Sequence, residues 1–210
     1  KDATKVVDGF TSALRFGGGA TFDELRQAQQ QALLVFKGAF QDVEQPIQIM
    51  NKLNASLALF SRNALRGSDA GTSLKRFIQV LPGVTSKASN TMSDALKRIG
   101  EGGSFAFDIE GRARTFTQSI DVVNRSLNAL DPQAKAQAIN DIFGTDAGRA
   151  AQVFVDTSRE ELNKLIRDIS RSEGITEKLA IAQNQGLKAA ADAFVSTIET
   201  IFIVAFPFIN

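Results

Sequence analysis

Two acidic residues near the middle of the chain, Asp108 and Glu110, have a spacing that could support catalysis. Glycoside hydrolysis typically uses a pair of carboxyl groups, one as general acid and the other as base or nucleophile. A spacing of two residues places both on one side of an extended segment. The sequence gives no sign that the pKa of either is raised, so solvated turn residues are the favoured interpretation and a carboxylate hydrolase is the weaker alternative.

Other common catalytic side chains are missing. The 210 residues include no Cys, His, Trp or Tyr, and all 16 aromatic residues are Phe. Without Cys and His there is no thiolate nucleophile, no Ser-His-Asp triad and no zinc site built from these ligands. We therefore expect no catalytic residue, no cofactor and no metal site.

Glycine-rich strings at residues 17–19, 67–73 and 100–103 resemble phosphate-binding loops in composition only. A P-loop requires Lys directly after its last glycine, whereas Thr72 follows Gly71. The glycines are interpreted as breaks between helices.

Charge is balanced along the chain, with 24 Lys and Arg residues against 23 Asp and Glu residues and a net charge of +1. Binding to a nucleic-acid backbone needs clustered basic side chains, and the sequence has no such block. Sequence-specific binding of genomic DNA is therefore not expected. The 43% of hydrophobic residues is ordinary for a folded domain.

Apolar residues recur at spacings of three and four almost throughout, which predicts an all-α fold. Thr21 with Glu24, and Ser158 with Glu161, have the form of capping boxes at helix starts. The expected helices cover approximately residues 21–40, 46–67, 68–81, 86–99, 116–130, 131–143, 147–155 and 158–169.

Residues 104–115 depart from helical spacing. Short runs of alternating character at residues 105–108 and 112–115 flank Ile109, Glu110 and Gly111, a pattern typical of a tight turn between strands. The sequence predicts one small β-hairpin near residues 105–115 within an otherwise helical domain.

Three regions are expected: an N-terminal helical segment at residues 1–60, a helical core domain at residues 61–172, and a C-terminal helix with an apolar end at residues 173–210. The chain starts without Met and stops in an apolar run, so we interpret it as a fragment.

The third region has an apolar seam. Small and aliphatic residues at heptad-like spacing, continued by an apolar stripe, predict an oligomer or membrane interface; a helix lying on its own core would show the same period. The uncharged run after Glu199 is too short for a bilayer, which needs about 20 residues. The residues of this interface are Ile175, Leu179, Ala182, Gly186, Ala189, Ala193, Ile198, Ile201, Phe202 and Ala205.

Three strings, in this order and spacing, resemble the core region of tail tape measure proteins of long-tailed bacteriophages and related tail-like particles. They are the glycine-rich stretch NALRGSDAGTSLKR at residues 63–76, the turn FDIEGR at residues 107–112, and the Phe-Gly element AINDIFGTDAG at residues 138–148. The resemblance covers roughly residues 53–182. It implies a compact helical scaffold rather than a catalyst.

The family resemblance also implies a location and partners. Copies of the protein, as a homotrimer or alternatively a hexamer, would lie in the tail tube lumen or tail tip against tube and tip proteins. They would set tail length during assembly and leave ahead of the genomic DNA, assisting its passage across the host membrane and envelope. The alternative functions are a membrane-active or pore-forming helical protein and, less favoured, a cell-wall hydrolase.

Overall fold

The computed structural model describes residues 2–83, 86–172 and 174–175. These residues form helices and loops with no strand, which confirms the all-α prediction. The helices of the described residues are α1 (Asp2–Phe16), α2 (Phe22–Phe40), α3 (Pro46–Arg62), α4 (Gly67–Val80), α5 (Ser86–Lys97), α6 (Phe116–Asn128), α7 (Pro132–Asp156) and α8 (Arg159–Ser170).

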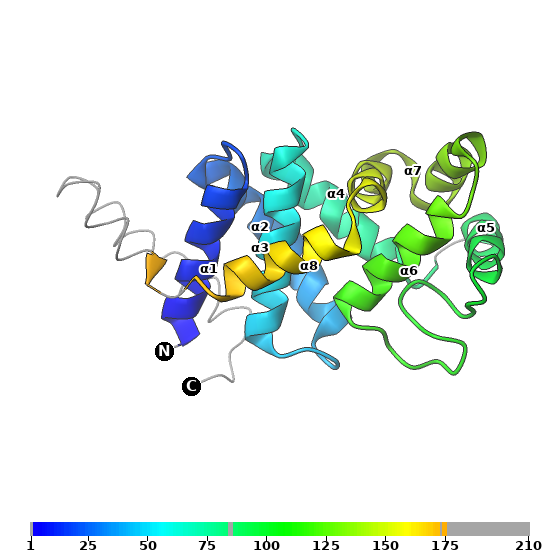
Figure 1. Cartoon of the computed structure of the whole chain (residues 1–210), viewed down its shortest axis with the longest axis horizontal. Coiled ribbons are helices and arrows are strands. Elements are labelled where there is room, and N and C mark those ends of the chain that lie inside the picture. The colour runs from blue at the N-terminus through cyan, green and yellow to red at the C-terminus, as the bar shows by residue number, and fades with distance from the viewer. Residues whose placement is uncertain (1, 84–85, 173, 176–210) are drawn as a thin grey trace.

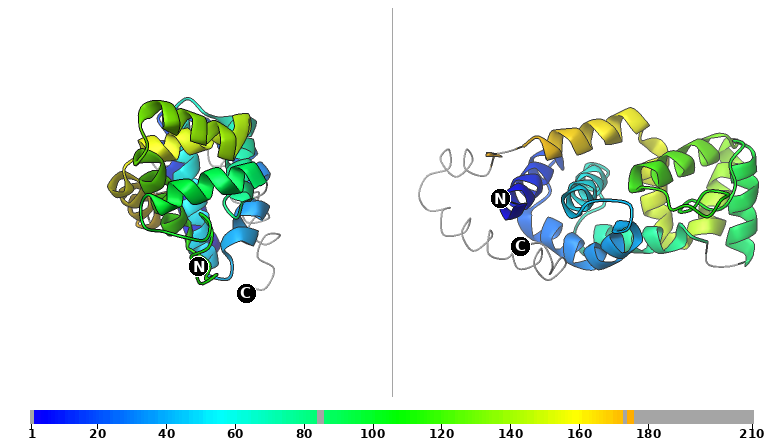
Figure 2. Two further views of the ribbon diagram at one scale, coloured as in Figure 1. Left: turned by 90° about the vertical axis from the view of Figure 1, so that its right-hand side faces the viewer. Right: turned by 90° about the horizontal axis from the view of Figure 1, so that it is seen from below.

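The helices build an elongated body (Figure 1). α1 and α3 lie toward one end, and α5, α6 and α7 toward the other. α4 connects the two ends, because it packs on α2 and also on α7, while α8 packs across α1 and α3 (Figure 2). The loop that carries Asp108 joins α5 to α6, so it lies at the end of the body formed by α5, α6 and α7.

Local capping signals start several helices where the sequence predicts. The Thr21 hydroxyl accepts the Glu24 N–H at 3.3 Å, and the Glu24 carboxylate accepts the Thr21 N–H at 2.8 Å, completing the box at the start of α2. Asp131 caps α7 with its carboxylate. Ser158 caps α8 by accepting the Glu161 N–H at 3.1 Å. Each cap satisfies a backbone donor that the helix itself leaves unpaired.

α7 is kinked at Gly144, the position where the sequence predicts a break. Gly144 has φ 65° and ψ −162°, while the residues on both sides remain helical. Glycine adopts this conformation at little cost because it has no Cβ. The two helices expected here are thus two arms of one kinked helix.

The junction between α3 and α4 differs from the prediction. α3 ends at Arg62 because Ala64 takes a left-handed φ of 59° and the next N–H group bonds back to a carbonyl of the last turn at 3.0 Å. This is the Schellman ending, here without its usual glycine. α4 then begins at Gly67, so Ser68 and Asp69 lie in its first turn and do not cap it.

The β-hairpin predicted near residues 105–115 is wrong. The segment holds only an isolated antiparallel bridge between Phe107 and Ala113. Extending the ladder would require the N–H groups of Ala106 and Arg112 to donate across the pair. Instead the Ala106 N–H donates to the carbonyl oxygen of Leu81, the residue after α4, at 3.2 Å, and the Arg112 N–H donates to the Asp108 carboxylate at 2.9 Å. Donors needed for the strands are therefore used elsewhere.

Phenylalanine rings form a continuous chain of contacts through the core, from α2 to the loop before α6. Adjacent ring centroids lie 4.8 to 5.9 Å apart. Such pairs add about 0.5–1.5 kcal/mol each beyond the burial of their area. The buried rings follow the order Phe36, Phe116, Phe154, Phe77, Phe143 and Phe105.

α4 crosses α2 at very short range. A Cβ added to Gly71 would lie 2.4 Å from the Ala28 carbonyl oxygen and 2.7 Å from the Gln31 Cβ. Both distances are below van der Waals contact, and the carbonyl oxygen belongs to helical backbone that has little freedom to move. Only glycine at position 71 allows the two helices to approach this closely.

We expect Gly71→Ala to lower the free energy of unfolding by about 2–3 kcal/mol, because the added methyl group overpacks the crossing. Gly38→Ala is the matched control: Gly38 lies in α2, and nothing lies within 4 Å of the position its Cβ would take. That change should raise stability by about 0.5–1 kcal/mol. Urea unfolding followed by far-UV circular dichroism measures both; effects of the same sign and size would contradict the close crossing.

Candidate functional site

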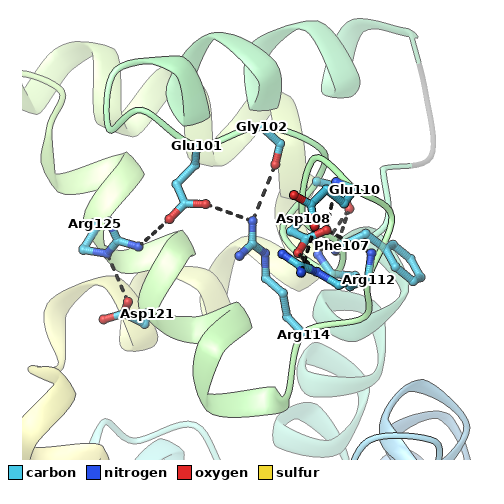
Figure 3. A network of polar contacts seen from close by, with 11 residues as sticks. Glu101, Gly102, Phe107, Asp108, Glu110, Arg112, Arg114, Asp121 and Arg125 are labelled. Atoms are coloured by element: carbon cyan, nitrogen blue, oxygen red, sulfur yellow. Dashed lines mark hydrogen bonds and ion pairs between the residues drawn. The ribbon is translucent and has the colours of Figure 1, made fainter.

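The α5–α6 loop, residues 98–115, contains the acidic pair noted in the sequence, and ion pairs connect it to the neighbouring helix α6 (Figure 3). Asp108 braces the turn at its tip. Its Oδ1 accepts the N–H groups of Glu110 and Arg112, both at 2.9 Å, and its Oδ2 accepts the Arg112 Nε at 2.7 Å. The Arg112 side chain, helped by the backbone donors, holds the pKa of Asp108 below its ordinary value.

Glu110 is part of the same clamp. Its carboxylate pairs with the Arg112 guanidinium at 2.8 Å, and its side chain is 62% exposed. A general acid needs a raised pKa, whereas here one guanidinium pairs with both carboxylates and the pKa of Asp108 is lowered. The geometry gives no support to a carboxylate hydrolase.

The start of α6 fixes one end of the loop. The Thr115 hydroxyl accepts the Gln118 N–H at 3.4 Å, and the Gln118 side chain accepts the Thr115 N–H at 2.8 Å. The buried Glu44 carboxylate accepts the Phe116 N–H at 2.7 Å and pairs with Lys52 at 2.8 Å. A carboxylate from outside the loop thus completes the helix start, a contact that no local pattern predicts.

Close backbone contacts and hydrogen bonds also fix the base of the loop, residues 103–105. Gly103 has φ 79°, and a Cβ there would lie 2.4 Å from the Asp108 carbonyl oxygen and 2.5 Å from that of Phe107. The Ser104 hydroxyl accepts two of the following backbone N–H groups, at 3.1 and 3.2 Å. Phe105 is fully buried at the end of the phenylalanine chain. The loop therefore has a defined conformation despite its lack of regular structure.

A chain of five charges ties the loop to α6 and α8. The Glu101 carboxylate accepts the Arg114 Nη2 at 3.1 Å and the Arg125 Nη2 at 3.0 Å. The Arg125 Nε donates to Asp121 at 3.0 Å (Figure 3). Asp121 also pairs with Arg159, at the start of α8, at 3.4 Å. Hydrogen bonds first from Arg125 and then from Arg114 lower the pKa of Glu101. No local pattern in the sequence indicates this network, because its members are spread over tens of residues.

Of the predicted oligomer or membrane interface, only Ile175 is described. Ile175 is half-buried, and its N–H donates to the Ser172 carbonyl oxygen at 3.2 Å. The preceding N–H, of Gly174, donates to the buried Asp8 carboxylate at 2.8 Å. The remaining nine residues lie outside the described residues, so this interface stays a prediction: Leu179, Ala182, Gly186, Ala189, Ala193, Ile198, Ile201, Phe202 and Ala205.

Comparison with known proteins identifies the family. The family model for phage-related minor tail proteins matches residues 1–144, well over half of the chain. The chain belongs to this family. The α5–α6 loop lies wholly inside the matched range. No curated protein and no solved structure matches the chain.

Membership in the minor tail family suggests a structural, non-enzymatic role in a phage tail and a location in the virion tail. The turn at Asp108, read as a possible catalytic pair from the sequence, then acts as a structural brace. Among the described helices, none combines the length and apolar character that crossing a membrane requires.

Replacing Glu101 tests the charge network. We expect Glu101→Gln to lower the free energy of unfolding at pH 7 by about 1–2 kcal/mol, because it leaves Arg114, whose side chain is 12% exposed, without its carboxylate partner. The lowered pKa of Glu101 means that its stabilisation is complete above the ordinary value of 4.5 and is lost as pH falls through the folded value. The difference from the unmodified protein should therefore shrink at acid pH.

Urea unfolding at pH 7 and at a series of lower pH values measures this difference. Asp94→Asn is the control, since it removes one charge from the exposed Asp94–Lys97 pair, in which both side chains are more than 70% exposed. It should change stability little at any of these pH values. A Glu101→Gln effect that stayed constant down to pH 2 would contradict an ionic origin.

Proposed function

We propose that the chain is a folded part of a tail tape measure protein, located in the tail tube or tip of a phage. The observation that carries the proposal is the family match over residues 1–144, which contains two of the tape-measure-like strings in full and most of the third. The proposed role is structural: the protein sets tail length during assembly and leaves ahead of DNA.

The three strings coincide with points where the fold is constrained, which supports the proposal. The string at residues 63–76 contains the Schellman ending of α3 and the crossing glycine, Gly71. The string at residues 107–112 is the turn braced by Asp108. The string at residues 138–148 contains the kink at Gly144.

The compact fold limits which part of the tape measure function this chain performs. A ruler needs extended helix at about 1.5 Å per residue, and 210 continuous helical residues would span about 315 Å. The longest described helix, α7, has 25 residues and is kinked, which corresponds to about 37 Å at most. We propose that this chain anchors the tape measure protein to the tail. The extended helix that sets tail length would then belong to a different part of that protein.

The proposal keeps the partners implied by the resemblance. These are copies of the chain itself, as a homotrimer or hexamer, tube and tip proteins, the host membrane at ejection, and genomic DNA in passing without specific binding. The membrane-active alternative rests on residues 194–210, which lie outside the described residues.

An in-frame deletion tests the proposed role. Removing residues 86–172 deletes α5 to α8 and, with them, most of the phenylalanine chain. In our proposal this region anchors the protein to the tail and does not set tail length by its own extent. We therefore expect tail assembly to fail or to give defective tips. Electron microscopy gives tail length, and mass spectrometry of purified tails shows whether the chain is incorporated.

Gly38→Ala in the same phage is the control: nothing lies within 4 Å of the position of its Cβ, so the fold should be retained and tails should have normal length. Deletion tails shortened by about 1.5 Å per removed residue would contradict the anchoring role. Normal tails that contain no peptide of this chain would contradict the proposed function as a whole.

A further inference from the structure

Apolar side chains stand exposed at the tip of the α5–α6 loop. The described residues include three well-exposed large hydrophobic side chains, and two of them, Phe107 and Ile109, belong to this tip. Ile109 is 79% exposed and Phe107 is 40% exposed, whereas Leu34 stands by itself on α2. We define the loop tip as residues 107–112. Turn positions are usually polar, so two apolar residues here are not explained by the fold.

The loop tip holds these side chains in a fixed arrangement. The Asp108 carboxylate binds backbone donors on the far side of the turn, and Arg112 clamps it. Gly102 lies directly behind Ile109: a Cβ on that glycine would come within 2.9 Å of the Ile109 Cδ1. A surface that is already ordered loses less conformational entropy when it binds a partner.

The charges beside the apolar residues indicate the chemistry of the partner. Asp108 and Glu110 share the single positive charge of Arg112, so the tip carries a net charge of −1. An anionic lipid surface would repel it, since loops and helices that bind such membranes carry Lys and Arg. A contact between the same tips of two copies would bring two like charges together. A protein recess with a basic rim would complement both the apolar residues and the charge.

We propose that the loop tip is a docking knob, with Ile109 and Phe107 inserting into an apolar recess bordered by Lys or Arg on a different protein of the tail. The proposal rests on the chain being a tail component. Ile109 supplies most of the buried area, Phe107 packs beside it, and Glu110 faces the basic rim. Asp108, whose side chain is 20% exposed, positions the knob by bonding across the turn, and its ion pair with Arg112 holds it there.

Photo-cross-linking in intact particles tests this docking. Phe107→p-benzoylphenylalanine keeps an aromatic ring at the tip and forms covalent adducts on irradiation. We expect one adduct, with a tail protein other than this chain, at a segment of apolar residues next to Lys or Arg. Adding Ile109→Ser should reduce the adduct about tenfold or more, because it removes the main buried side chain.

Leu34→Ser is the matched control, since it also removes an exposed aliphatic side chain, and it should leave the adduct yield unchanged. Equal thermal unfolding midpoints of the purified variants show that the fold is retained. Absence of an adduct, or adducts only between copies of this chain, in particles shown by mass spectrometry to contain it would overturn the docking proposal alone. Particles without the chain would overturn the proposed function with it.

Vesicles distinguish a membrane partner from a protein partner. The purified chain should not float with vesicles of phosphatidylethanolamine and phosphatidylglycerol at physiological salt. If the unmodified chain floats and Ile109→Ser abolishes flotation, the loop tip binds a lipid surface. That result would overturn the proposal that its partner is a recess on another protein.

Discussion

The rest of the structure depends on the contact between α2 and α4 at Gly71. The backbone of α4 lies so close to the Ala28 carbonyl that no side chain fits between the two helices. This contact fixes the course of α4, which connects the two ends of the body. From the C-terminal half of α4, Phe77 stacks on Phe143, and Phe143 stacks on Phe105 at the base of the α5–α6 loop.

The loop receives its conformation through this succession of contacts. The carbonyl oxygen of Leu81, the residue after α4, accepts the Ala106 N–H, and the buried Phe105 is the last ring of the phenylalanine chain. Ion pairs from Glu101 then connect the loop to α6. An irregular segment is therefore held in one conformation by named contacts, and an ordered surface loses less conformational entropy when it binds a partner. These residues hold the conformation of the loop and show no catalytic arrangement, which is consistent with a structural role in a tail.

The sequence predicted those features that depend on neighbouring residues. The capping box at Thr21 and the cap at Asp131 follow from local chemistry and are confirmed, and the break predicted at Gly144 is a kink within one helix. The predicted hairpin is wrong because the Ala106 and Arg112 N–H groups donate outside the expected ladder, the first of them to the carbonyl oxygen of Leu81 just after α4. The end of α3 was misplaced because a non-glycine residue, Ala64, takes the left-handed conformation.

The candidate site was located in part. The sequence predicts the turn at Asp108 but leaves its chemistry open between a structural and a catalytic role, and the bonds from Arg112 support the structural role. The ion network of Glu101 and the exposure of Ile109 depend on tertiary packing, so no periodicity or motif could show them. The C-terminal seam remains a sequence prediction.

Cryo-electron microscopy of intact tails tests the central claim most directly. The account predicts, in the tail tube or tip, a compact helical unit in which α4 crosses α2 at Gly71 and the α5–α6 loop meets another tail protein. Density showing residues 2–172 as continuous extended helix along the tube, or tails without any density for this chain, would contradict it.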